Sequence, residues 1–201
     1  MIHFVACILC SFYIARDVSK RDDREGISIT LTILILFVLF FALRLVTLFL
    51  SIRNEKRLKS NHAVEFGKRN SLVLGALHVI FYLAAIAESW EQGASFNSIS
   101  VIGVVLFGFS YIILCWVIIQ LRDIWTLKIY IAKDHKINKN FLFKYFRHPN
   151  YFLNIIPELI GIGLLCHAWY AMLVLLPFYA IVLIVRIVQE ERVMQAHFKE
   201  F

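Results

Sequence analysis

Long apolar segments alternate with short polar connections along this chain of 201 residues. The segments 27–52, 71–88 and 98–121 each supply the roughly 20 mostly apolar residues that a helix needs to cross a bilayer. A fourth segment, 151–189, is long enough for two helices joined by a tight turn. The pattern therefore predicts an all-α, polytopic integral membrane protein whose chain ends in a helical hairpin.

The N-terminal stretch decides whether five or six transmembrane helices are expected. Residues 1–16 are apolar but short for a full crossing, and they lack the basic leader and the small-residue cleavage site of a signal peptide. We interpret them as a sixth, short membrane segment. Because the chain contains no internal repeat and no low-complexity tract, residues 1–201 are predicted to form one domain, with 1–26 as an extra N-terminal segment.

Charge gives the expected orientation. Lysine and arginine number six in the connection 53–70 and seven in 122–150, but none occurs in 89–97. The positive-inside rule therefore places both basic connections and the C-terminus in the cytoplasm. Trp90 and Trp169 are then expected at the outer membrane interface and Trp125 at the inner one.

Composition narrows the class of protein. The chain is 60% hydrophobic and 17% charged, which excludes an ordinary soluble domain. Its net charge of +7 reflects topology and attraction to anionic lipid headgroups rather than nucleic-acid binding, since no recognition motif accompanies the basic residues. The cysteines all lie in apolar segments, without the spacing of a metal site, so a packing role is favoured and no metal is predicted.

Four ionisable residues lie inside the apolar segments. A charge at mid-membrane costs roughly 2.5–3.5 kcal/mol on insertion scales, so Arg44, Glu158 and Arg186 each require an explanation. Arg44 either extends to the interface or forms an interior ion pair, and both readings stay open. His78 is expected to be a hydrogen-bonded packing residue. Glu158, which follows Pro157, is predicted to face an interior cavity.

The C-terminal hairpin is predicted to gather polar residues at one end. Arg186 and Glu190 are four apart on a helix and can pair, which is consistent with a structural salt bridge or with a site. A tight turn between the last two helices brings the start of one beside the end of the other. The residues concerned are Arg147, His148, Asn150 and Tyr151 on the first, and Arg186, Glu190 and Glu191 on the second.

These residues also carry a family resemblance. "FRHPNY" (146–151), followed by a hydrophobic hairpin, Arg186 and "EE" (190–191), resembles the isoprenylcysteine carboxyl methyltransferase and phospholipid methyltransferase superfamily. The likeness is greatest to its YpbQ-like branch and covers about residues 40–198. The further blocks that carry it are "RLVTLFLSIRNEKRL" (44–58), "HAVEFG" (62–67), "LHVIFYLAAIAE" (77–88) and "WTLKI" (125–129).

The resemblance implies an integral-membrane methyltransferase that uses S-adenosyl-L-methionine (SAM). It assigns cofactor binding to Arg147, His148, Tyr151, Glu190 and Glu191, and it places Arg186 and Glu158 nearer the methyl acceptor as the catalytic residues. The expected acceptor is an oxygen of a lipophilic molecule, such as an alkylpyrone-type polyketide or a prenylcysteine. A hydroxyl acceptor needs a base, for which Glu158 and His148 are the candidates.

Two alternatives remain at this point. Membrane sterol reductases that use NADPH have a similar Arg-His-Pro motif, and Lys133, Lys136 and Lys139 would suit a 2′-phosphate. A non-enzymatic membrane adaptor is the other alternative, although the buried charges of Glu158 and Arg186 count against it.

Overall fold

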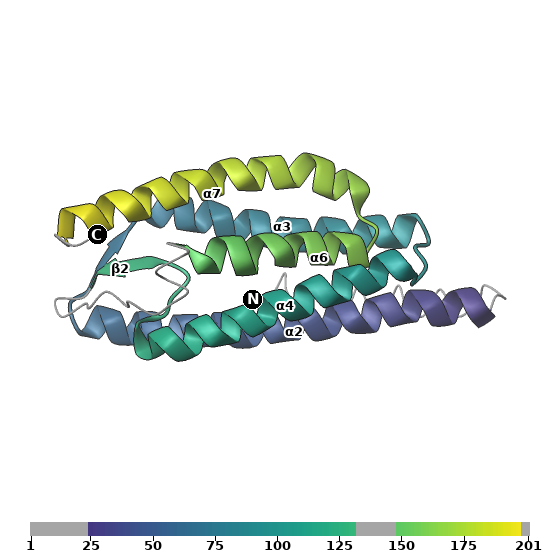
Figure 1. The fold of residues 1–201 in the computed structure, drawn as a ribbon, viewed down its shortest axis with the longest axis horizontal. Helices are drawn as coiled ribbons and strands as arrows, with labels where there is room; N and C mark the ends of the chain where they lie inside the picture. Colours follow the sequence, from purple (N-terminus) through teal and green to yellow (C-terminus); the bar gives the residue numbers. More distant parts are fainter. Residues whose placement is uncertain (1–23, 132–147, 198–201) are drawn as a thin grey trace, which may run out of the picture.

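The computed structural model describes residues 24–131 and 148–197, in which helices dominate. The helices run along a common long axis (Figure 1), and the prediction of an all-α, polytopic membrane protein is confirmed. The α-helices are α2 (Arg24–Ser60), α3 (Lys68–Glu91), α4 (Ser98–Leu121), α6 (Ile156–Leu165) and α7 (Trp169–His197). The short elements are η1 (Arg122–Ile124), η2 (Asn150–Ile155), β1 (Val64–Phe66) and β2 (Ile129–Ile131).

Four helices are long and apolar enough to cross a membrane, and a fifth is shorter. The four lie within α2, α3, α4 and α7, as the apolar segments predict. The fifth runs from Asn150 to Leu165 and is about 24 Å long at roughly 1.5 Å per residue, against a bilayer core of about 30 Å. Its polar start is therefore recessed relative to the ends of the longer helices. The predicted segment 1–16 lies outside the described residues.

The helical hairpin is present, but its two helices pack mainly on other partners. A turn at 166–168 joins α6 to α7, while α6 packs chiefly along α4 and α7 chiefly along α3. The helices α4 and α6 cross closely at two glycines: a Cβ atom on Gly103 would lie 2.5 Å from the carbonyl oxygen of Gly161. Only glycine permits this approach, so α6 is held in a fixed position beside α4.

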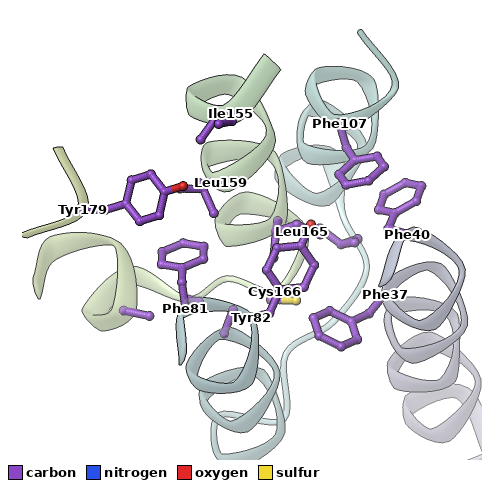
Figure 2. Packing of buried hydrophobic residues seen from close by; sticks show 14 of the residues in the cluster. Phe37, Phe40, Phe81, Tyr82, Phe107, Ile155, Leu159, Leu165, Cys166 and Tyr179 are labelled. Carbon is purple, nitrogen blue, oxygen red and sulfur yellow. The ribbon is translucent and has the colours of Figure 1, made fainter. Parts of the chain in front are cut away.

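Aromatic side chains join α2 to the other helices. The rings of Phe40 and Phe107 stack with their centroids 3.8 Å apart, and Phe37 lies against Tyr82 of α3 (Figure 2). Phe81, Tyr82 and Phe107 are almost completely buried. These large rings, rather than close backbone contact, hold α2 against the core of the bundle.

A π-helical turn begins the α6 segment. Pro157 has no N–H, so it cannot donate to the carbonyl four residues earlier. The preceding residues 150–155 form a wider π turn. In this turn the N–H of Ile156 donates to the carbonyl of Tyr151. The side chains of Tyr151, Asn154 and Glu158 are all buried. The first helix of the hairpin thus carries three polar side chains into the interior of the bundle.

The two ends of the bundle differ. At one end, here called the strand end, β1 and β2 pair antiparallel beside the C-terminal part of α7 (Figure 1). The other end, the turn end, contains the α3–α4 and α6–α7 turns and the exposed rings of Trp90 and Trp169. Trp125 lies at the strand end but is buried against Leu114 and Val117. Trp125 therefore packs within the protein, and its place at the inner membrane interface stays a prediction.

Candidate functional site

Five side chains meet at the strand end: His148, Tyr151, Arg186, Glu190 and Glu191, here called the strand-end cluster. The hydroxyl of Tyr151 is at its centre. It donates to Glu190 Oε2 at 2.6 Å and accepts from Arg186 Nε at 3.2 Å. Tyr151 thereby joins the start of the α6 segment to two successive turns of α7.

Each of the three guanidinium nitrogens of Arg186 donates a hydrogen bond. Its Nη1 donates to Ser71 Oγ at 2.6 Å, and its Nη2 donates to the backbone carbonyl of Leu127 at 2.9 Å. The side chain is only 2% exposed. Its donors are therefore committed to α3, to the loop before β2 and to Tyr151. The guanidinium is a fixed part of the wall rather than a free cation.

The two glutamates are more accessible. The side chains of Glu190 and Glu191 are 31% and 34% exposed. Glu190 Oε2 lies 3.6 Å from His148 Nδ1, and Glu191 Oε1 lies 3.4 Å from His148 Nε2. The accessible charge of this cluster is thus carboxylate, with the imidazole between the two acids.

The neighbours of His148 determine the position of its ring and the direction of its pKa shift. Its ring stacks on Tyr151 with the centroids 5.6 Å apart. Burial lowers the pKa of His148, but the hydrogen bonds and negative charges of Glu190 and Glu191 outweigh burial, so the pKa lies above its ordinary value. The protonated imidazole is therefore favoured and partly offsets the two carboxylates.

A left-handed glycine forms another part of the wall. Gly67, at the start of α3, has φ of 63°, and a Cβ atom there would lie 2.7 Å from Gln189 Oε1. Within the described part of the chain, Gln189 Oε1 is buried without a hydrogen-bond donor. A buried acceptor oxygen therefore lies in the wall of the cluster, next to Arg186.

A second group of polar residues lies half-way along the helices: Arg44, His78, Tyr82, Asn154 and Glu158, here called the mid-helix cluster. Arg44 pairs with the carboxylate of Glu158 through both Nε and Nη2. Its Nη2 also donates to Asn154 Oδ1 at 2.8 Å. The structure thus resolves the two readings of Arg44 in favour of an interior ion pair.

Two aromatic residues of α3 complete the surroundings of Glu158. The Tyr82 hydroxyl donates to Glu158 Oε1 at 2.6 Å, and His78 Nε2 lies 3.4 Å from the same oxygen. The other ring nitrogen of His78 lies 3.3 Å from the hydroxyl of Tyr179 in α7. Glu158 was predicted to face a cavity; its side chain is instead fully buried within a polar network.

The two clusters are linked through one helix. Asn154 contacts Arg44 through its oxygen, and its amide nitrogen donates to Asn150 Oδ1 at 2.8 Å. Tyr151 of the strand-end cluster lies on the same π turn as Asn150 and Asn154. A continuous line of polar side chains therefore runs from the strand end to the middle of the bundle.

The predicted cluster at the hairpin is largely assembled. His148, Tyr151, Glu190, Glu191 and Arg186 lie together, whereas Arg147 falls outside the described residues. Among the described residues, Arg186 and Glu190 are joined through the Tyr151 hydroxyl rather than by the direct pair expected from their spacing. Their shared helical face was readable from the sequence, but the bridging hydroxyl was not.

Sequence reasoning missed several partners of these residues. The missed partners are Ser71, Tyr82, Asn154, Tyr179 and the carbonyl of Leu127. One local signal was available, since His78 and Tyr82 are four apart on α3 and share a face. The others depend on which helices become neighbours.

Comparison with known proteins decides the family. Residues 101–196 match the model of the "Isoprenylcysteine carboxyl methyltransferase (ICMT) family", a range that contains both the Arg-His-Pro motif and the hairpin. The chain belongs to the isoprenylcysteine carboxyl methyltransferase family. It is therefore a membrane methyltransferase.

Two other proteins are similar to this chain over most of its length. An uncharacterized protein of Haemophilus influenzae is 54% identical over 160 residues, which cover 80% of this chain and 93% of that protein. The uncharacterized protein YpbQ of Bacillus subtilis is 29% identical over 154 residues, covering 72% of this chain and 86% of its own. This methyltransferase thus falls in the YpbQ-like branch, as its motifs indicate. No solved structure matches the chain.

Proposed function

We propose that this membrane methyltransferase transfers a methyl group from SAM to an oxygen of a lipophilic acceptor, with the cofactor held at the strand-end cluster. The single observation that supports this is the charge of the cluster: its carboxylates are accessible, while its guanidinium is buried and donates from each of its three nitrogens to other groups. SAM carries two positive centres, an ammonium and a sulfonium, and one carboxylate, so its net charge is positive. A site whose free charge is negative suits such a ligand.

The residues present fit this cofactor. Glu190 and Glu191 supply acceptors for an ammonium and for ribose hydroxyls. The ring of Tyr151 supplies an aromatic surface of the kind that attracts a cation. Arg186 acts through Tyr151 by fixing the position of its hydroxyl. The side chains at this end thus include binding groups of the right sign and type.

The bound cofactor supplies an electrophilic methyl group on sulfur. The protein's part is alignment and removal of water, because an in-line displacement depends chiefly on positioning. The recessed start of the α6 segment serves this purpose, since it places Tyr151 within the bundle rather than at its rim. Glu158, further along the same helix, is proposed to lie nearer the acceptor.

The acceptor is proposed to arrive from the bilayer and the cofactor from the cytoplasm. The exposed cations of the first basic connection, Arg53, Lys56, Arg57, Lys59, Lys68 and Arg69, all lie at the strand end. The positive-inside rule therefore supports a cytoplasmic strand end and a cytoplasmic C-terminus. A lipophilic hydroxyl or carboxyl compound, such as an alkylpyrone-type polyketide or a prenylcysteine, is the acceptor class implied by the family resemblance.

The reductase alternative is disfavoured by the same charge argument. NADPH carries a pyrophosphate and a 2′-phosphate, and these would face Glu190 and Glu191. Like charges at a partly buried site are unfavourable. Lys133, Lys136 and Lys139, which suited a phosphate at the level of sequence, lie outside the described residues.

Calorimetry on the purified, detergent-solubilised protein tests the proposal, using S-adenosylhomocysteine and NADPH as separate titrants. Micromolar binding of S-adenosylhomocysteine alone is expected. Glu190→Gln and His148→Ala should each abolish that binding because they remove a partner of the cluster. Glu88→Gln is the matched control: Glu88 lies at the turn end, where it accepts from the N–H groups of Tyr170 and Ala171. Binding of NADPH alone, or wild-type affinity in the two cluster variants, would overturn the proposal.

A further inference from the structure

The Arg44–Glu158 pair has features that a structural salt bridge does not need. Glu158 is fully buried, whereas the side chains of Arg44 and His78 are 13% and 24% exposed. Both partly exposed residues lie half-way along helices that are long and apolar enough to span a membrane, so lipid is the medium expected beside them. A molecule dissolved in the bilayer can therefore reach the pair from the side of Arg44 and His78.

The charge of the pair restricts what can bind there. Arg44 and Glu158 neutralise each other, and Tyr82 and Asn154 are uncharged. A carboxylate brought to this position would add an unpaired negative charge in a low-dielectric setting, which is strongly unfavourable. A neutral hydroxyl adds no charge and can donate to the carboxylate of Glu158.

We propose that Arg44 and Glu158 form an exchangeable pair, in which Glu158 takes the proton of a neutral acceptor hydroxyl and Arg44 then holds the acceptor oxygen as an anion. The ligand class is a lipophilic molecule with an ionisable hydroxyl. The total charge of the site stays constant: the positive charge of Arg44 changes its partner from the glutamate to the acceptor. This inference rests on the proposed methyltransferase function and assigns roles within it.

The protons and electron pairs of the proposed step balance. The O–H bond of the acceptor breaks and its proton moves to Glu158. The electron pair left on oxygen forms the new O–CH3 bond, and the pair of the broken S–CH3 bond stays on sulfur. Glu158 then returns its proton towards the partly exposed His78, whose Nε2 lies 3.4 Å from Glu158 Oε1. The overall reaction releases one proton, as methyl transfer from a sulfonium to a hydroxyl requires.

Two neighbours act as positioning residues in this scheme. Asn154 Oδ1 accepts from Arg44 Nη2 at 2.8 Å, so it holds the guanidinium whichever anion is present. Tyr82 donates to Glu158 Oε1 at 2.6 Å and can donate instead to an oxygen that replaces it. The exchange therefore needs the movement of one carboxylate rather than a rearrangement of helices.

A chromogenic probe tests the exchange without any turnover. The probe is a para-nitrophenol carrying a long alkyl chain, whose phenol and phenolate forms absorb differently. It is titrated into full-length protein in neutral detergent, with S-adenosylhomocysteine present and pH varied. The wild type should bind it with a larger phenolate fraction than protein-free micelles show at the same pH.

The two partners of the pair should then behave in opposite ways. Arg44→Gln should weaken phenolate binding by about tenfold or more, because it removes the only proposed cation, and Arg44→Lys should retain part of it. Glu158→Gln should strengthen phenolate binding, because Arg44 loses its competing anion. A merely structural pair predicts losses in both. Glu88→Gln at the turn end should leave probe binding unchanged.

The outcomes separate this inference from the function on which it rests. Opposite effects of Arg44→Gln and Glu158→Gln support the exchange, and Glu158→Gln with Arg44→Lys suffices if Arg44→Gln does not fold. Effects in the same direction, or binding of the phenol without ionisation by a protein that still binds S-adenosylhomocysteine, overturn the exchange alone. A wild type that binds no S-adenosylhomocysteine overturns the proposed function and this inference with it.

Discussion

The mid-helix and strand-end clusters contain the same kinds of side chain but connect them differently. Each has one arginine, at least one glutamate, a tyrosine and a histidine. In the mid-helix cluster Arg44 pairs directly with Glu158. In the strand-end cluster the Tyr151 hydroxyl stands between Arg186 and Glu190.

The position of each cluster explains the difference. In the middle of the bundle no water can compensate a charge, so positive and negative groups must cancel locally. At the strand end Arg186 and the protonated His148 balance the two glutamates in number, but the glutamates are about one-third exposed while Arg186 and His148 are buried, so a ligand meets carboxylate first. These accessible carboxylates can meet a cationic ligand, whereas the buried mid-helix pair accepts only a ligand that preserves its neutrality.

The largest effect is expected from breaking the buried pair. Removal of one partner of a buried ion pair costs about 3–5 kcal/mol of unfolding free energy, so Arg44→Gln should be strongly destabilising. The double variant Arg44→Gln/Glu158→Gln should cost much less than the sum of the single changes, because no unpaired charge is left. Reversible unfolding in mixed micelles measures this coupling.

The same cycle at the strand end provides the comparison. Arg186 and Glu190 should show weak coupling, because the Tyr151 hydroxyl separates them and Arg186 also bonds Ser71 and the Leu127 carbonyl. Strong coupling there, or additive losses for Arg44 and Glu158, would contradict the assignment of a direct pair to one cluster and a bridged pair to the other.

An intermediate effect is expected from the two tyrosine hydroxyls. Tyr151→Phe removes one donated and one accepted hydrogen bond, which leaves both Glu190 and Arg186 short of a partner; a loss of about 1–3 kcal/mol is expected. Tyr82→Phe removes one hydrogen bond to Glu158, but Glu158 still pairs with Arg44. A smaller loss of unfolding free energy, about 1 kcal/mol, is therefore expected. Equal losses in the same unfolding assay would show that Tyr151 is not a bridge.

The sequence predicted the helices and much of the strand-end cluster for a simple reason. Apolar runs of membrane length are unambiguous, and the hairpin brings "RHPNY" near Glu190 because its connecting turn is short. The partners contributed by α2 and α3 were not predictable in this way. That Arg44 meets Glu158, or that Ser71 meets Arg186, depends on helix neighbours set by aromatic packing and by the close glycine crossing of α4 and α6.

Local backbone features were harder still to predict. The π turn at 150–155 and the pairing of β1 with β2 leave no periodic signal in such short segments. The carbonyl of Leu127, which accepts from Arg186, could not be found from side-chain chemistry at all. The functional roles of the strand-end residues and the orientation in the membrane stay predictions.

The smallest effect is expected from the titration of His148, and it distinguishes the partly exposed strand-end cluster from the buried mid-helix cluster. The pKa of His148 is raised in the folded protein, so its contribution to stability is fully present below the unfolded value of about 6.5. That contribution is lost as pH rises through the higher folded pKa, because the neutral imidazole no longer offsets Glu190 and Glu191. The thermal midpoint of the wild type should therefore fall over this window more than that of His148→Gln. Parallel curves for the two proteins would mean that the carboxylates do not favour the protonated imidazole.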